Sequence, residues 1–161
     1  MANVPLEQLI QSYAQGADQL HRAVDDLTPQ ELMAVPIPGR WPTHTVVLHL
    51  ADADAAFADR MRRIIAEDDP ALPAWDENRF AEHLFYAEQS AQDALALIEL
   101  TRRQMTRILH QLPDAAFDRP GQHSVRGRQT LRDVVQAAIG HLDHHLNFIH
   151  QKRAKLGKPI R

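Results

Sequence analysis

The sequence predicts an all-α protein, a four-helix bundle with short accessory helices. Four segments repeat apolar residues at spacings of three and four, which places those residues on one face of a helix. Capping patterns begin at Thr28, Ser90 and Thr130, where a hydroxyl residue precedes an acidic residue by three positions. No segment has a convincing strand pattern, so we expect no β-structure.

The first long helix is expected from residue 6 to residue 27. Its apolar face consists of Leu6, Ile10, Tyr13, Ala17, Leu20, Val24 and Leu27. The pattern at Thr28, with proline at the first helical position, predicts a short extra turn before Pro36, Pro38 and Gly39 break the chain.

A second long helix should begin near Pro42-Thr43, with Trp41 as a core anchor at its start. Its inward face is formed by Val46, His49, Leu50, Ala53, Phe57, Arg60, Met61 and Ile64. Prolines and acidic residues at 68–73 end this helix and open a loop through Trp75 and Asp76. A short helix is expected over residues 79–86.

The third long helix is expected to start at Ser90 and to end before Pro113. Residues 120–127 form a turn-rich connection, in which His123 is expected to be a solvated loop residue. The last helix opens at Thr130, and its buried face carries Leu131, Val134, Ala138, His141, His145 and Ile149. The basic segment 152–158 is expected to be a solvated helix end, favoured by the helix dipole. The pattern leaves the up-and-down order of the helices open.

Composition indicates one soluble domain covering residues 1–161. Hydrophobic residues make up 44% and charged residues 24%, and the net charge is −3. No basic patch predicts a nucleic-acid partner, and no apolar run approaches the ~20 residues of a membrane span. The absence of cysteine excludes disulfides, thiolate zinc sites and a cysteine nucleophile. Together with the lack of a signal-peptide pattern, this leads us to expect a cytoplasmic protein.

Three histidines are expected to face the core together. His141 and His145 are four residues apart on one helix face, and His49 faces inward on another helix. Three neutral imidazoles suit Zn²⁺ or Ni²⁺, with zinc the default, and leave a fourth position open. The alternative is that these are core histidines satisfied by hydrogen bonds. We favour the metal, and expect Gly140 to make room for a close neighbour in the helix.

Other known site types fit less well. A zincin needs glutamate directly after the first histidine of its pair, where this chain has Leu142. A di-iron carboxylate bundle needs Glu-x-x-His on two helices, and the sequence has no such tetrapeptide. A Ser-His-Asp triad stays open, although no serine lies in a nucleophile-elbow context. Near the histidines, Asp52 is the favoured acceptor for a ligand's second N–H, and His144 is a candidate acid or base at the rim.

Several of these residues resemble the DinB-like superfamily of metal-binding four-helix bundles. The similarity is carried by Trp41, Val47-Leu48-His49-Leu50-Ala51-Asp52 and the segment from His141 to Ile149. Within the superfamily, Arg60, the loop from Pro70 to Glu77 and Thr130-Leu131 resemble the YfiT-type branch, which includes the bacillithiol S-transferases. The resemblance covers roughly residues 6–155.

The resemblance implies a bundle with crossover connections, a homodimer, and zinc or nickel held by His49, His141 and His145. It further implies transfer of a low-molecular-weight thiol to an electrophilic small-molecule substrate. Arg60 would then hold an anionic group of the thiol, unless it forms a structural ion pair or an exposed end of the apolar face. Trp75 or Asp76 would line the mouth. Hydrolysis by metal-bound water and non-catalytic metal binding remain alternatives. The branch often has another histidine where this chain has Asp54, a departure that bears on substrate handling.

Overall fold

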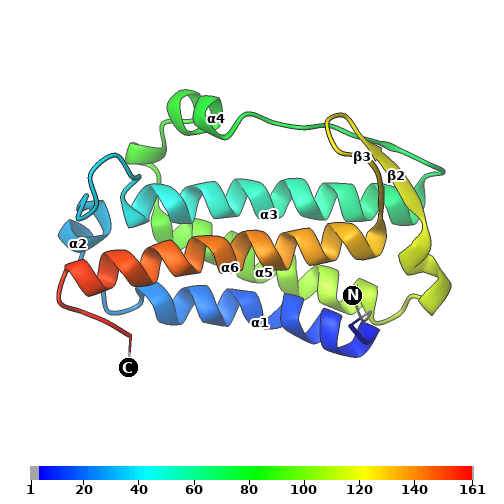
Figure 1. Ribbon diagram of the computed structural model, residues 1–161, viewed down its shortest axis with the longest axis horizontal. Helices are drawn as coiled ribbons and strands as arrows, with labels where there is room; N and C mark the ends of the chain where they lie inside the picture. The colour runs from blue at the N-terminus through cyan, green and yellow to red at the C-terminus, as the bar shows by residue number, and fades with distance from the viewer. Residues whose placement is uncertain (1–3, 161) are drawn as a thin grey trace.

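Four long helices form the bundle of the computed structural model, which describes residues 4–160 (Figure 1). They are α1 (Leu6–Val24), α3 (Thr43–Ala66), α5 (Ala91–Leu109) and α6 (Leu131–Lys155). Both α1 and α3 pack against α5 and α6, so α1 and α3 lie diagonally across the bundle. Helices α3 and α5 run in the same direction, and residues 67–90 carry the chain back along the bundle between them (Figure 1). The four-helix bundle with a crossover connection is thus confirmed.

The predicted caps begin the helices as expected. The hydroxyls of Thr28, Ser90 and Thr130 accept hydrogen bonds from the backbone N–H three residues later, at 3.3, 3.1 and 3.1 Å. The first opens the short helix α2 (Pro29–Met33). The accessory helix α4 (Glu77–His83) starts two residues earlier than predicted, because Asp76 caps it. Two 3₁₀ turns, η1 (Tyr86–Glu88) and η2 (Asp114–Asp118), complete the helical elements.

The predicted apolar faces form the core. The side chains that lie almost entirely out of contact with solvent include Tyr13, Leu20, Leu50, Met61, Ile64, Ile98, Met105 and Ile149. Within residues 4–160, no helix combines the length and apolar character needed to cross a membrane.

A buried ion pair joins the four long helices at mid-bundle. Arg102 of α5 donates to both carboxylate oxygens of Asp54 on α3, at 2.6 and 2.8 Å. The same guanidinium donates to the carbonyls of Tyr13 on α1, at 3.0 Å, and Ala138 on α6, at 3.5 Å. A Cβ at Gly16 would lie 2.0 Å from Arg102 Nη1, so glycine makes room for the guanidinium. Asp54 therefore belongs to the core.

The expectation of no β-structure is wrong. Three short strands, β1 (Ala71–Leu72), β2 (Pro120–His123) and β3 (Gly127–Thr130), form a sheet at one end of the bundle (Figure 1). β1 is parallel to β2, and β2 is antiparallel to β3. Strands of two to four residues show no periodicity in the sequence. Gly121 allows the close contact, because a Cβ there would lie 2.9 Å from Leu72.

His123 ends β2 and is buried, so the expectation of a solvated loop residue is also wrong. Its Nδ1 accepts hydrogen bonds from the backbone N–H groups of Val125 and Arg126, both at 3.2 Å. These two bonds fix the imidazole tautomer, leaving Nε2 as the protonated nitrogen when the ring is neutral.

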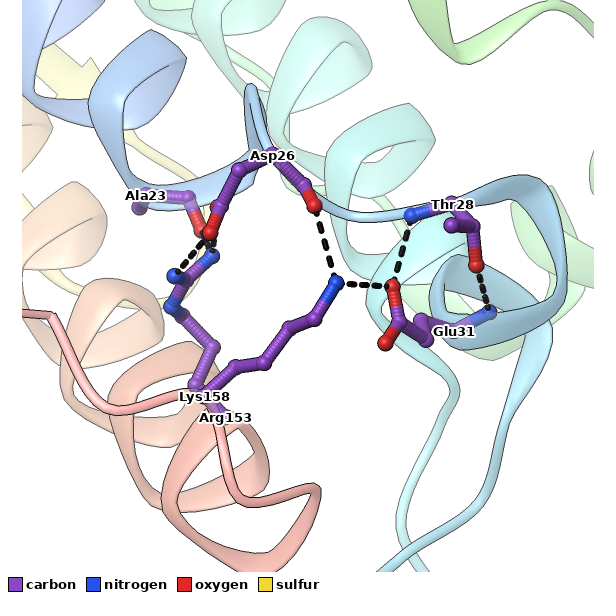
Figure 2. Close-up of polar contacts among 6 residues, drawn as sticks. All are labelled: Ala23, Asp26, Thr28, Glu31, Arg153 and Lys158. Carbon is purple, nitrogen blue, oxygen red and sulfur yellow. Dashed lines mark hydrogen bonds and ion pairs between the residues drawn. The ribbon is translucent and has the colours of Figure 1, made fainter.

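The basic end of α6 is anchored to the bundle rather than solvated. Arg153 is buried and donates to both carboxylate oxygens of Asp26, at 2.6 and 3.0 Å (Figure 2). Lys158 donates to Glu31 at 2.8 Å and to the carbonyl of Asp26 at 3.2 Å (Figure 2). The hydrogen bond from Arg153 holds the pKa of Asp26 below its usual range. The charges of Arg153 and Lys158 thus have specific partners in Asp26, between α1 and α2, and in Glu31 of α2, which sequence periodicity does not show.

Candidate metal centre

The structure brings His49, His141 and His145 together at one point. The His49 Nε2 atom lies 3.1 Å from Nε2 of His141 and 3.1 Å from Nε2 of His145. One nitrogen from each of the three rings falls within a group no wider than 4.8 Å. His49 is fully buried on α3, while the two α6 histidines are partly exposed. The neighbouring helices α3 and α6 therefore supply a three-imidazole cluster with one open side.

The three imidazoles are neutral at pH 7. Burial lowers the pKa of His49 and of His141 to about 4, and that of His145 to about 3. The neighbouring imidazoles lower the pKa values of His141 and His145 further. Neutral rings whose Nε2 atoms converge cannot satisfy one another fully by hydrogen bonds, because each Nε2 is either a donor or an acceptor. Three nitrogen lone pairs facing one point suit a divalent ion such as Zn²⁺ or Ni²⁺.

The expected role of Asp52 beside a ligand is wrong. The Asp52 carboxylate accepts a hydrogen bond from the hydroxyl of Tyr86 in η1, and no hydrogen bond joins it to a histidine of the cluster within residues 4–160. The Nδ1 atom of His49 has no hydrogen-bond partner among the residues that the structure describes. Aromatic rings surround it instead, with the centroids of Trp41 and Trp75 at 5.4 and 5.5 Å from the His49 ring. This aromatic wall excludes water from the inner side of the cluster.

Glu77 is a candidate site residue that the sequence analysis did not single out. Its Oε2 lies 3.8 Å from Nε2 of His49, on the open side of the cluster. Asp76, which was expected to line the mouth, instead caps α4 by accepting hydrogen bonds from the N–H groups of Asn78 and Arg79, at 3.0 and 3.1 Å. The capping geometry turns Glu77 toward the histidines. Only the position of an acidic residue directly after the Trp75-Asp76 pair could have suggested this role.

Arg60 lies beside the cluster in a pocket of about 270 Å³, which we call the Arg60 pocket. Its lining includes Phe57, Arg60, Trp75, Glu77, His123, Arg126 and His141. Arg60 is 7% exposed, and its guanidinium donates to the Pro73 carbonyl at 2.7 Å. No ion pair with Arg60 forms within residues 4–160, so the structural ion-pair alternative is wrong. The β2–β3 hairpin contributes His123 from the end of β2 and Arg126 from the turn, and Arg126 adds a positive charge that the sequence analysis did not place here.

A second pocket, of about 290 Å³, opens on another side of the cluster. This Lys152 pocket is lined by Gly39, Arg40, Trp41, Val46, Glu77, Asn78, His144, His145, Phe148 and Lys152. His144 is exposed at its rim, with its ring centroid 5.4 Å from that of His145. Its position fits the expected rim residue, and its chemical role stays a prediction.

The two pockets meet at the histidine cluster. His141 lines the Arg60 pocket, His145 lines the Lys152 pocket, and Glu77 lines both. Two small molecules can therefore approach one centre from different sides. Gly140 plays no part in this arrangement. It is exposed, and a Cβ there would meet no atom within 4 Å, so the expectation that it makes room for a neighbour is wrong.

Known proteins resemble this chain in sequence and in fold. YfiT of Bacillus subtilis, provisionally named a metal-dependent hydrolase, is 26% identical over 140 residues, covering 86% of this chain and 79% of YfiT. A similarly named protein of Oceanobacillus iheyensis is 27% identical over 130 residues, covering 81% of this chain and 75% of its own. The YfiT structure, a four-helix bundle of unusual topology, superposes with a TM-score of 0.90 over 98% of this chain and 90% of that one, at 25% identity.

The fold also resembles that of a mycothiol-dependent maleylpyruvate isomerase. The TM-score is 0.71 at 14% identity, covering 89% of this chain and 60% of that one. The model of the DinB superfamily matches residues 12–149, a range that contains all three histidines of the cluster. The chain belongs to the DinB superfamily.

Proposed function

We propose that this protein is a zinc- or nickel-dependent enzyme that transfers a low-molecular-weight thiol to an electrophilic small molecule. The observation that carries the proposal is the pair of cationic pockets that meet at one three-histidine centre. A hydrolase needs one organic substrate and water, whereas a transferase must hold two organic substrates at once. The partly exposed open side of the cluster favours catalysis over metal binding without turnover.

A divalent ion held by His49, His141 and His145 would lower the pKa of a bound thiol and favour the thiolate. Arg60 and Arg126 line the Arg60 pocket and would bind an anionic group of that thiol, which would orient its sulfur toward the cluster. Glu77, beside His49 on the open side, is placed to accept the thiol proton. In a substitution, the C–S bond then forms as the bond to the leaving group breaks.

The similarities support a metal-dependent reaction. YfiT is named for metal-dependent hydrolysis, and the isomerase with the shared fold is named for its dependence on a thiol. Hydrolysis is the second candidate, because the Glu77 carboxylate could equally assist water on the open side of the cluster. That reading predicts cleavage of 4-nitrophenyl acetate without added thiol.

The test is a spectrophotometric assay of the zinc- and nickel-loaded protein with 4-chloro-3-nitrobenzoate. Cysteine, coenzyme A, mycothiol and bacillithiol serve as the thiols. We expect thiol-dependent release of chloride and a thioether product with at least one of them. If none of the four thiols reacts faster than in buffer, thiol transfer is wrong, and ester cleavage without thiol would support hydrolysis.

The His145→Ala variant tests the centre itself. Losing one of three ligands should reduce the bound metal, measured by elemental analysis after gel filtration, to well below one ion per chain. His150→Ala removes an exposed histidine from the same helix and is the matched control. Equal metal content in His145→Ala and the control would contradict the proposed ligand set.

A further inference from the structure

Lys152 is a buried cation that faces the second pocket. It lies seven residues after His145 on α6, so the two residues share one helix face about 10 Å apart. Helical side chains incline toward the N-terminus, which directs the ammonium group toward His145. The residue is only 2% exposed, and its side chain lines the Lys152 pocket. The pocket thus has a positive charge beyond the metal centre.

This charge has no counterion within residues 4–160. The Lys152 ammonium group forms no hydrogen bond or ion pair with any of these residues. Arg40, which lines the same pocket, stacks over Phe148 at 4.9 Å instead of pairing with a carboxylate. Burial, with Arg40 adding repulsion, lowers the pKa of Lys152 to about 8. Burying an ammonium without a partner is costly, which indicates that an anion completes the site.

Arg153, the next residue in α6, is a buried cation with a structural role. Arg153 is also buried, at 3% exposed, but its guanidinium holds Asp26 in a two-bond ion pair (Figure 2). The two residues are adjacent in α6 and equally shielded from solvent. Only Lys152 faces a cavity and lacks an acidic partner, so its charge is available to a ligand.

We propose that Lys152 and Arg40 bind the acid group of the electrophilic substrate, so that the second substrate is a carboxylate-bearing electrophile. The assignment rests on the proposed thiol transfer, in which the Arg60 pocket takes the thiol. With its carboxylate bound at Lys152, the electrophilic substrate would direct its reactive carbon toward His145 and toward the sulfur of the thiol. Among the described residues that line this pocket, Glu77 is the only one with a carboxylate, and it lies at the histidine cluster rather than at Lys152.

A matched pair of electrophiles tests this inference in the metal-loaded enzyme. 4-Chloro-3-nitrobenzoate and 4-chloro-3-nitrobenzamide react in the same way, with C–S bond formation and loss of chloride, but only the first carries a charge. In Lys152→Met we expect KM for the benzoate to rise about ten- to hundredfold, the value of a charge-assisted hydrogen bond, and KM for the benzamide to stay unchanged. Lys155→Met, an exposed lysine on the same helix, should alter neither constant.

Anion binding can also be measured without turnover. The chain has two tryptophans, one lining each pocket, so Trp41 reports on the Lys152 pocket alone in the Trp75→Phe variant. Succinate should change Trp41 fluorescence and succinamide should not. The response should weaken in Arg40→Gln, which changes an exposed residue and so is safe for folding, and disappear in Lys152→Met.

The outcomes separate this inference from the proposed function. Succinate binding that depends on Lys152, without turnover of either electrophile, would support the anion site and contradict thiol transfer. Thiol transfer to the benzamide and the benzoate with equal KM, unaffected by Lys152→Met, would overturn the anion site and leave thiol transfer standing. Absence of a Lys152-dependent succinate signal would likewise count against the site.

Discussion

Two buried polar clusters share helix α3, and the protein satisfies the polar groups of one but not those of the other. In the first, the Arg102 guanidinium finds the Asp54 carboxylate and two backbone carbonyls, so its charge and its donors are matched within the protein. In the second, three imidazoles direct nitrogens at one another, and His49 Nδ1 has no partner in the described chain. Asp54 follows His49 by only five residues, so burial alone does not distinguish them.

The difference lies in what each cluster still requires. The ion pair is complete without any added group, and Gly16 shapes the core around it. The histidine cluster is complete only with a cation, and it adjoins two pockets through which ligands can reach it. A buried polar group whose hydrogen-bond and charge partners all come from the protein therefore contributes to stability. A buried polar group that lacks such partners and lies beside a cavity contributes to binding.

The largest effect is expected from breaking the ion pair with Asp54→Ala. Removing one partner leaves the Arg102 charge buried and uncompensated, which should lower the free energy of unfolding by about 3–5 kcal/mol. Urea denaturation followed by circular dichroism measures the change. Asp59→Ala, which removes an exposed pair with Arg63 on the same helix, should cost less than about 1 kcal/mol. Similar losses in the two variants would contradict the structural role of the core pair.

Alanine at two helical glycines should give opposite effects. In Gly16→Ala the new Cβ would lie 2.0 Å from Arg102 Nη1 and 2.5 Å from Leu142 Cδ2, so we expect a loss of about 1–3 kcal/mol. Gly140→Ala meets no atom within 4 Å on α6 and should gain about 0.5–1 kcal/mol from helix propensity. Thermal unfolding measures both, and destabilisation by Gly140→Ala would restore a structural role for that glycine.

The periodicity of apolar residues was sufficient to predict the helical parts of the molecule. The four long helices and the convergence of His49 with His141 and His145 follow from the 3.6-residue period. The caps at Thr28, Ser90 and Thr130 follow from a hydroxyl residue placed three positions before an acidic residue. The sheet could not be predicted, because its strands are too short to have a period and because β1 pairs with β2, about fifty residues later in the chain.

The contacts around the histidines also depend on tertiary structure. Asp52 faces Tyr86 and Asp76 caps α4, so both carboxylates are engaged elsewhere, and Glu77 takes the place beside His49. Lys152 and Arg153 are neighbours in a basic segment, and only the position of Asp26 decides which of the two is paired. Neither helical phase nor composition carries this information.

The smallest expected effect concerns the pH dependence of stability in the metal-free protein. Burial lowers the pKa of His145 to about 3, whereas the unfolded chain has the ordinary value of 6.5. At pH values between these two pKa values, the imidazole of His145 is protonated in the unfolded state and neutral in the folded state. Its contribution to the free energy of unfolding is therefore fully present above pH 6.5 and is lost as the pH falls toward the pKa of the folded state. From pH 7 to pH 6, His145 should contribute less than about 1 kcal/mol of this loss, since its ring is partly exposed.

The measurement is urea unfolding of metal-free wild type and His145→Ala at pH 7 and pH 6. Wild type should lose more stability than His145→Ala over this interval, because the variant lacks one histidine that resists protonation in the folded state. His150→Ala, which changes an exposed residue of α6, should follow wild type. If His145→Ala and wild type lose equal stability, the imidazole at 145 is not held neutral by the fold. In that case electrostatics would not support the view that the three histidines need a cation while the Arg102–Asp54 ion pair does not.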